Sequence, residues 1–166
     1  MARKKTGAGT PAAGALTRAG VAHTLHPYAH DPRADSFGDE AAEALGVDPA
    51  RVFKTLIVAV DGRLAVAVVP VSGQLNLKAL AHALGASRAV MAETAVAERT
   101  TGYVRGGISP LGQKRQHPTV VDTSALDQAT VYVSGGRRGL DIELTPGSLI
   151  ALTDALVAAI GRPTGG

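Results

Sequence analysis

Residues 52–69 read VFKTLIVAVDGRLAVAVV, and this stretch predicts a β-hairpin. Two apolar runs flank Asp61-Gly62, a dipeptide typical of two-residue hairpin turns. Because side chains alternate between the faces of a strand, Lys54 shares its face with the apolar residues two and four places away. An ammonium on an apolar face is costly unless it is paired, functional or able to reach water. Lys54 is therefore either a functional group or a lysine whose stem extends to solvent.

Outward from this hairpin, helix and strand signals follow one another without regular alternation. Capping residues predict helices that start after Thr10, Ser36, Asn76 and Thr145, and the last of these is expected to continue to Ile160. Further strands are expected at residues 21–28, 89–91, 119–122, 130–134 and 140–144. This order favours an α+β fold with a largely antiparallel sheet over a doubly wound parallel one.

Length and composition indicate one domain that needs no disulfides. The 166 residues contain no cysteine and carry a formal net charge of +3. We expect a flexible basic tail at 1–9, one domain at 10–161 and a second tail at 162–166. The apolar runs fall far short of the ~20 residues that span a bilayer, and no secretory signal is evident. These features favour a cytoplasmic protein without a membrane partner, and the modest charge permits an anionic partner without demanding one.

Residues 101–112, TGYVRGGISPLG, form a glycine-rich loop. Glycine allows a ligand to approach the main chain, whose N–H groups can bind a phosphate or a developing oxyanion. Gly106, Gly107, Ile108 and Ser109 are the candidate site residues here, although the segment could equally be a plain connection. It is not a P-loop, because the Gly-Lys-Ser/Thr ending is missing.

Residues 134–143, SGGRRGLDIE, combine glycines with two arginines and an acid. Ser134, Gly135 and Asp141 could contact a substrate amine or ribose hydroxyl. Arg137-Arg138 here, and Lys114-Arg115 beyond the first glycine segment, could bind RNA phosphates. A hairpin with a charged tip explains the same pattern.

The three residues that come nearest to a metal-ligand pattern are His26, His30 and Asp31. Their spacing is loose, proline lies between the histidines, and no HExxH helix is present, so we expect no metal and no cofactor. No GxSxG motif indicates a serine nucleophile.

Taken in order, these segments closely resemble the YbaK/EbsC type of aminoacyl-tRNA editing protein, the Cys-tRNA(Pro) deacylases, which are related to the editing domain of bacterial prolyl-tRNA synthetases. The resemblance spans about residues 10–160. It rests on residues 10–12 (TPA), 26–32 (HPYAHDP), 37–40 (FGDE), 52–56 (VFKTL), 73–75 (GQL), 102–113 (GYVRGGISPLGQ) and 132–143 (YVSGGRRGLDIE).

The resemblance implies a compact unit with peripheral helices around a strongly curved, barrel-like sheet. It assigns the family's functional lysine to Lys54 and its functional glycine to the Gly106-Gly107 pair. It also implies that the substrate pocket is lined by Tyr28, Phe37, Thr55, Ser134 and Asp141. The implied activity is removal of cysteine from mischarged Cys-tRNA(Pro), and from Cys-tRNA(Cys), with the substrate's own thiol as the proposed nucleophile.

Several alternatives stay open at this point. Within the enzyme class, the substrate could be Ala-tRNA(Pro), and a bound water could attack the ester instead of the thiol. Outside that class, the chain could be a non-catalytic module that binds the tRNA acceptor end, or a small-molecule binding protein. The expected partners are aminoacylated tRNA and prolyl-tRNA synthetase; no DNA partner is expected.

Overall fold

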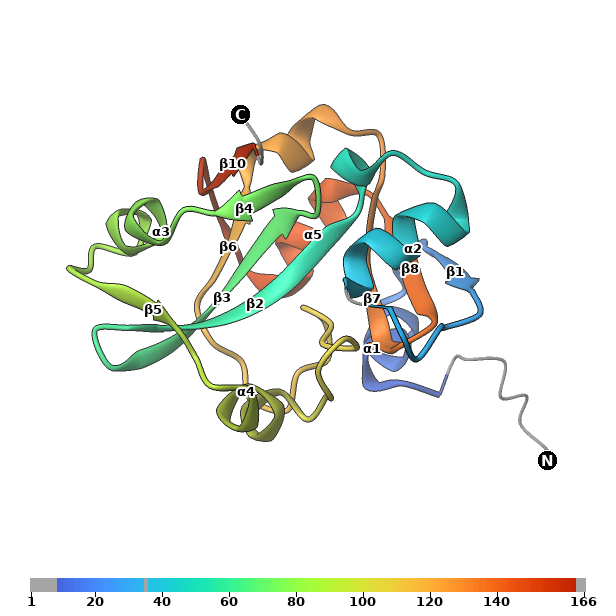
Figure 1. Ribbon diagram of the computed structural model, residues 1–166, viewed down its shortest axis with the longest axis horizontal. Coiled ribbons are helices and arrows are strands. Elements are labelled where there is room, and N and C mark those ends of the chain that lie inside the picture. The colour runs from blue at the N-terminus through green and yellow to red at the C-terminus, as the bar shows by residue number, and fades with distance from the viewer. Residues whose placement is uncertain (1–8, 35, 164–166) are drawn as a thin grey trace.

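The computed structural model describes residues 9–34 and 36–163 (Figure 1). Within that part of the chain the helices are α1 (Pro11–Ala19), α2 (Phe37–Leu45), α3 (Leu77–Ala83), α4 (Thr94–Thr101) and α5 (Pro146–Thr153), with 3₁₀ turns at Pro49–Arg51 and Thr123–Asp127. The strands are β1 (Thr24–Pro27), β2 (Phe53–Val60), β3 (Arg63–Pro70), β4 (Gly73–Leu75), β5 (Ala89–Met91), β6 (Thr119–Asp122), β7 (Val131–Arg137), β8 (Leu140–Leu144), β9 (Leu156–Ala158) and β10 (Gly161–Pro163).

The helices begin where the capping signals predict. The side chain of Ser36 accepts from the backbone N–H of Asp39 at the start of α2, and Thr10, Asn76 and Thr145 cap α1, α3 and α5 in the same way. The expected end of the last helix is wrong. Asp154 adopts a left-handed conformation, with φ of 53°, which ends α5, so that Leu156 begins β9 and Ile160 lies just before β10.

Strands β2 and β3 form the predicted hairpin, with Phe53 opposite Pro70 and Val60 opposite Arg63. Asp61 and Gly62 both have positive φ, of 49° and 82°, as a type I′ turn requires. This hairpin occupies the centre of a five-stranded sheet in the order β5-β2-β3-β6-β9 (Figure 1). Residues 52–69 therefore form the inner strands to which the other strands of this sheet are added.

The sheets are mixed in direction. A second sheet has the order β1-β8-β7, and β10 pairs with β4. The pairings β3–β6 and β6–β9 are parallel and the others are antiparallel. A single parallel bridge from Val52 to Tyr132 joins the two larger sheets. The mixed α and β architecture is as expected, but no sheet in the described residues closes into a barrel.

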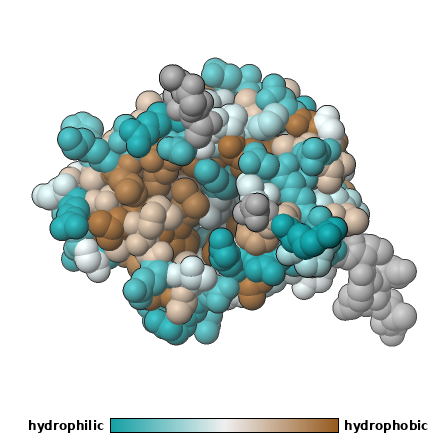
Figure 2. All heavy atoms as spheres, viewed as in Figure 1, coloured by the Kyte–Doolittle hydropathy of each residue, from teal (hydrophilic) through white to brown (hydrophobic). Residues whose placement is uncertain are grey.

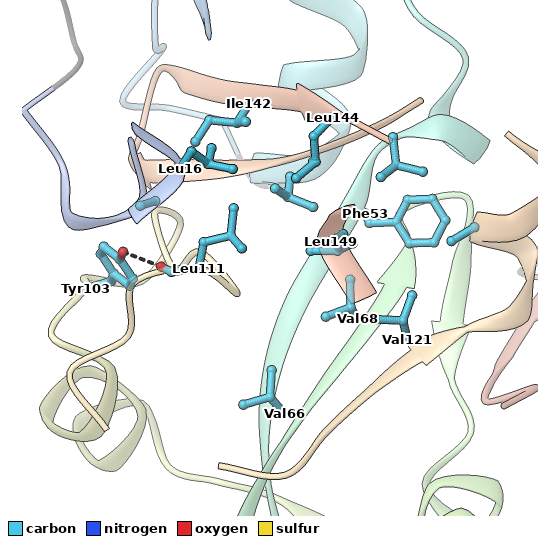
Figure 3. Packing of buried hydrophobic residues seen from close by; sticks show 14 of the residues in the cluster. Leu16, Phe53, Val66, Val68, Tyr103, Leu111, Val121, Ile142, Leu144 and Leu149 are labelled. Carbon is cyan, nitrogen blue, oxygen red and sulfur yellow. Dashed lines mark hydrogen bonds between the residues drawn. The ribbon is translucent and has the colours of Figure 1, made fainter. Parts of the chain in front are cut away.

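The main core lies between the two larger sheets. Phe53 and Val68 of the first sheet pack with Ile142 and Leu144 of the second, as Figure 3 shows, and Ile57 belongs to the same cluster. Leu16 of α1, Leu149 of α5 and the loop residues Tyr103 and Leu111 close this core, and the Tyr103 hydroxyl donates to the backbone C=O of Leu111. The opposite face of the hairpin carries Val58 and Val69, which pack with Leu80 of α3. Both faces of the five-stranded sheet are therefore covered over much of their area.

Strand β10 extends across the domain boundary that the sequence predicts at residue 161. Arg162 and Pro163 pair with Gln74 and Gly73 of β4. The buried carboxylate of Asp122 explains this extension, because its Oδ1 accepts from the backbone N–H groups of Ile160 and Gly161. Residues 1–8 and 164–166, where the tails were expected, lie outside the described residues.

Candidate active site

A cavity of about 400 Å³ opens where the start of α2, the edge of β2 and the glycine loop meet β7 and β8. These segments lie side by side in Figure 1, although they are far apart in the sequence. The structure brings eight of the predicted site residues to this cavity: Tyr28, Phe37, Lys54, Thr55, Gly106, Ile108, Ser134 and Asp141. The separate sequence signals therefore converge on one place.

The cavity follows an open stretch of the edge of β2. On this side β2 pairs with β5 only from Val58 onward, and the C=O of Ile57 accepts from the backbone N–H of Ala92. At the other end, Val52 bridges to β7. Because backbone groups alternate in direction along an antiparallel strand, the N–H and C=O of Thr55 face the same side as the Ile57 C=O. The cavity can therefore wrap around the edge, from Lys54 on one face to Thr55 on the other.

Lys54 lies between two clusters of the apolar face that the sequence predicts. Val58 belongs to the cluster under α3, and Val52 belongs to the cluster under α2. The Lys54 side chain lies at the gap between them and is half-buried. No carboxylate of the described residues forms a salt bridge with it. Burial lowers the pKa of the ammonium, and the nearby charge of Asp39 in the first turn of α2 partly opposes that effect.

Two polar atoms in the cavity wall are buried and have no hydrogen-bond partner among the residues that the structure describes. They are Oγ1 of Thr55 and Oδ2 of Asp141, and Asp141 is only 5% exposed. Leaving a buried polar atom unpaired costs roughly 1–3 kcal/mol. Because Thr55 and Asp141 both line the cavity, these two atoms are candidates to bind a polar ligand there.

Burial also sets the protonation of the groups around Asp141. With no partner for the charge, desolvation raises the pKa of Asp141 to about 7. Tyr28, just beyond the end of the neighbouring strand β1, has its pKa raised to about 12 by burial and then by the Asp141 charge. At neutral pH the cavity therefore contains a neutral phenol and a carboxyl group close to its titration midpoint.

The glycine loop needs glycine at both central positions because other segments press against it. A Cβ at Gly106 would lie 2.8 Å from Phe37 Cδ1 and 2.8 Å from Arg138 Nε, and Gly106 has a φ of 85°. A Cβ at Gly107 would lie 2.7 Å from the Cα of Arg137. The backbone N–H of Gly107 donates to Val104 C=O, and Gly107 does not line the cavity. In this arrangement Gly106 and Ile108, whose N–H groups make no hydrogen bond within the described residues, are the better placed to meet a ligand.

Two further residues expected in the pocket lie behind it. Ser109 is fully buried, and its Oγ accepts from the backbone N–H of Leu111. Gly135 is buried against Leu140, where a Cβ would come within 2.6 Å of the leucine Cγ. Both residues shape the loops that carry the cavity wall and do not line the cavity itself.

The four cations proposed for RNA binding are exposed and lie outside the cavity lining. The backbone N–H groups of Lys114 and Arg115 donate to Thr101 and Thr100 at the end of α4. Arg137 and Arg138 lie at the tip of the β7–β8 hairpin, and the guanidinium of Arg138 packs over the ring of Phe37. The second pair is therefore much closer to the cavity.

Next to the cavity lies a polar cluster in which the groups are paired, which we call the Glu143 network. It comprises His26, Arg51, Thr130 and Glu143. Glu143 accepts from Thr130 Oγ1, contacts His26 Nε2 at 2.8 Å and lies 3.6 Å from the Arg51 guanidinium. The Thr130 hydrogen bond is the first cause of a lowered pKa at Glu143. This network joins the segment before β2 to β1 and β8.

The histidines of the considered metal cluster bind separate carboxylates. His26 contacts Glu143, whereas His30 Nδ1 lies 2.9 Å from Glu40 in α2. No group of three or more possible metal ligands occurs among residues 9–34 and 36–163. Likewise, no described helix is long and apolar enough to cross a membrane.

Sequence reasoning missed part of the cavity wall. The segment from Met91 to Ala97 lines it, yet carries no glycine or charge pattern that would have drawn notice. Arg105 also lines it, with its guanidinium 5.6 Å from the Phe37 ring centroid. A basic residue next to Gly106 was the available signal for Arg105. Figure 2 shows apolar surface over β2, β3 and β5, and exposed Val90 and Met91 belong to this region.

The structure defines a small α+β protein with a pocket in which Lys54, the glycine loop and Asp141 meet. Residues 31–152 match the model of the aminoacyl-tRNA editing domain, and the chain belongs to this family.

Full-length similarity extends to one relative from Enterococcus faecalis. That protein is 38% identical over 161 residues, covering 96% of this chain and 98% of its own, and is named "Putative Cys-tRNA(Pro)/Cys-tRNA(Cys) deacylase EbsC". A proline–tRNA ligase of Shouchella clausii is 38% identical over 93 residues, which is 56% of this chain and 16% of the ligase. A solved structure described as a putative trans-editing enzyme for prolyl tRNA synthetase superposes with a TM-score of 0.82 at 25% identity, covering 92% of this chain and 95% of that one.

Proposed function

We propose that this protein is a trans-editing deacylase that removes cysteine from Cys-tRNA(Pro) and from Cys-tRNA(Cys). The observation that carries the proposal is the cavity itself, which combines Lys54, Gly106 and the two unpartnered polar atoms of Thr55 and Asp141. Full-length similarity to the Enterococcus faecalis relative supports the substrate class. The cavity volume of about 400 Å³ suits an amino acid with part of a ribose.

In this proposal the protein positions the ester and stabilises charge, and the substrate supplies the nucleophile. The cysteine sulfur attacks the carbonyl carbon of its own ester, and a C–S bond forms while an oxyanion develops. The C–O bond to the ribose then breaks, the ribose oxygen takes up the proton that the thiol loses, and cysteine leaves as a cyclic thioester that water can open. Holding sulfur and carbonyl in contact replaces much of what a protein nucleophile would supply.

Several of the cavity residues have a part in this scheme. The Lys54 ammonium and the backbone N–H groups of Gly106 and Ile108 in the glycine loop stabilise the developing oxyanion. Ser134 and Asp141 hold the amino group of the substrate or a ribose hydroxyl. A carboxyl with a pKa of about 7 can serve either as an acceptor for the amine or as a neutral donor. Tyr28 and Phe37 form apolar wall, and the Thr55 hydroxyl, which has no hydrogen-bond partner among the described residues, bonds to the substrate.

Two further parts of the proposal concern where the reaction occurs. The net charge of +3 provides little general attraction for tRNA, so we expect prolyl-tRNA synthetase to hold most of the tRNA while this protein acts on the acceptor end. We place both in the cytoplasm, where tRNA is charged.

The test is the release of amino acid from a panel of charged tRNAs: Cys-tRNA(Pro), Cys-tRNA(Cys), Ala-tRNA(Pro) and Pro-tRNA(Pro). We expect release of cysteine from the first two, undiminished by a chelator. Preferential release of alanine would instead identify an Ala-tRNA(Pro) deacylase and remove the thiol from the mechanism. RNA binding with only the spontaneous rate of release would identify a non-catalytic module, and abolition by a chelator would contradict a metal-free site.

A further inference from the structure

The mouth of the cavity carries a cluster whose chemistry the ester reaction does not use. We call it the Phe37 cluster, and it consists of Phe37, Arg105 and Arg138. The guanidinium carbon of Arg138 lies 4.9 Å from the centroid of the Phe37 ring, and that of Arg105 lies 5.6 Å from it. The three residues come from the start of α2, the glycine loop and the β7–β8 turn, so three separate segments meet here.

The cluster is held together by more than contact with the ring. Arg138 Nε donates to the backbone C=O of Arg105 at 2.7 Å. Gly106 lets the loop approach both partners, since a Cβ there would collide with the Phe37 ring and with Arg138 Nε. The backbone N–H of Arg105 is tied to the Glu98 carboxylate at 2.8 Å. The Arg138 guanidinium and the Arg105 main chain are therefore positioned, although both arginine residues are exposed.

The cluster is continuous with the cavity. Phe37 and Arg105 line the cavity wall. Arg138 does not line it and packs over the ring of Phe37. A ligand whose reactive end occupies the cavity must therefore pass flat and cationic surfaces as it leaves. Phenyl and guanidinium faces both stack on nucleobases, and guanidinium N–H groups also bind phosphate.

We propose that the Phe37 cluster is the binding site for the terminal nucleotide of the RNA, with the base stacked on it and the adjoining phosphate bound by an arginine. The proposal rests on the proposed function, because an aminoacyl group in the cavity places its ribose at the mouth and the attached base one bond further out. It gives a role to Arg105, a residue whose presence neither the glycine motif nor the ester chemistry explains. The chemistry recognised is a flat base next to a negative charge.

The test separates the base from its phosphates. The probes are an uncharged CCA trinucleotide and the same trinucleotide with an abasic 3′ residue, each titrated into the full chain at low salt. We expect the wild type to bind the complete trinucleotide about tenfold more tightly, which is the scale for one stacked base. Phe37→Leu should bring this preference close to one while retaining apolar volume, and Arg105→Ala should weaken binding of the complete trinucleotide several-fold.

The matched control is Arg63→Ala, which removes the same charge at the start of β3, where Arg63 pairs with Val60 at the last position of β2. It should leave both affinities and the preference unchanged. Equal binding of the two probes by the wild type, or a full preference retained in both Phe37→Leu and Arg105→Ala, would overturn the proposal. Deacylation by the wild type distinguishes the two levels: if cysteine is released but no base preference exists, only the stacking site fails. If no charged tRNA is deacylated, the proposed function fails whatever the trinucleotides show.

Discussion

Two polar regions lie beside each other at the start of β2, and they differ in whether their polar groups are paired. In the Glu143 network, the acid has three partners and a lowered pKa. Asp141 lies two residues before Glu143 on β8. It has a buried oxygen with no hydrogen-bond partner among the described residues, and its pKa is raised to about 7. Paired groups stabilise the fold, whereas groups left unpaired at a stability cost are those that a ligand is expected to complete. Mutations can test that division residue by residue.

The largest effect is expected at Lys54, a cation of the cavity wall that makes no salt bridge within the described residues. Lys54→Ala should lower the single-turnover deacylation rate by roughly 10²–10³, the scale for losing one oxyanion donor. Lys54→Arg should rescue only partly, because a planar fork replaces a compact ammonium. Thermal melting should show a folded variant, since the half-buried stem has no salt bridge to lose among the described residues.

Its control is the paired cation, Arg51, which donates to Thr130 and lies over the Tyr132 ring. Arg51→Ala should cost about 2 kcal/mol of stability, the scale for hydrogen bonds to charged groups, with little change in the deacylation rate of the folded fraction. A folded Lys54→Ala variant with the wild-type rate would return Lys54 to the interpretation of a stem reaching for water.

The two acids of β8 should give opposite pH dependences of stability. The folded-state pKa of Asp141 is raised, so its contribution is fully present below the unfolded pKa near 3.8 and is lost as pH rises through about 7. Between pH 5 and pH 8 this loss amounts to about 2–3 kcal/mol. Asp141→Asn should remove it, which makes the variant gain on the wild type as pH rises.

Glu143→Gln should behave in the reverse sense. The pKa of Glu143 is lowered from 4.5, so its contribution is present above that value and lost as pH falls through the folded pKa. The deficit of this variant should be visible at pH 7 and shrink below about pH 4. Urea unfolding across this range measures both variants, and parallel curves for the two would contradict the assignment of one paired and one unpaired acid.

A smaller effect is expected for two threonines. Thr55→Val removes an unpartnered hydroxyl, so we expect about 1 kcal/mol of added stability together with a lower deacylation rate. Thr130→Val removes a hydroxyl that donates to Glu143 and accepts from Arg51, so we expect about 1–3 kcal/mol of lost stability. Loss of stability in both variants would show that Thr55 has a partner after all.

The smallest effect is expected at the exposed basic pairs. Replacing Lys114-Arg115 or Arg137-Arg138 by alanine should weaken RNA binding and lower the slope of log affinity against log salt by roughly one for each phosphate that the variant no longer binds. Filter binding at several salt concentrations measures the slope. Since Arg138 is next to the cavity and Lys114 is not, the Arg137-Arg138 variant should show the larger decrease. Unchanged slopes in both variants would assign the pairs to solvated surface.

Local chemistry made the hairpin and the helix starts predictable, because their signals lie within a few residues. Asp61-Gly62 needs only its own backbone angles, and Ser36 needs only the N–H of Asp39. The end of α5 was not predictable in this way. Asp154 has a left-handed conformation, and the Asp122 carboxylate accepts a hydrogen bond from the backbone N–H of Ile160. Both features depend on tertiary structure, which the spacing of apolar residues does not encode.

The candidate site divides along the same line. The family resemblance picked out Lys54, Thr55 and Asp141, and the structure brings all three to one cavity, while their roles stay predictions. Their lack of partners could not be read from the sequence, because it depends on which side chains come near after folding. Arg105 was missed for the same reason. Its place in the site depends on packing against the ring of Phe37, which lies sixty-eight positions earlier in the chain.

The open edge of β2 has one more consequence, which concerns self-association. An unpaired strand edge is a template on which another chain can add a strand and begin to aggregate. Here the gap is bounded by the bridge at Val52 and by the hydrogen bond at Ile57, and α2 and the glycine loop stand over it. A foreign strand would need a longer and less enclosed edge than this. The backbone groups at this edge of β2 can therefore bind a small ligand, while a strand of another polypeptide cannot pair with them.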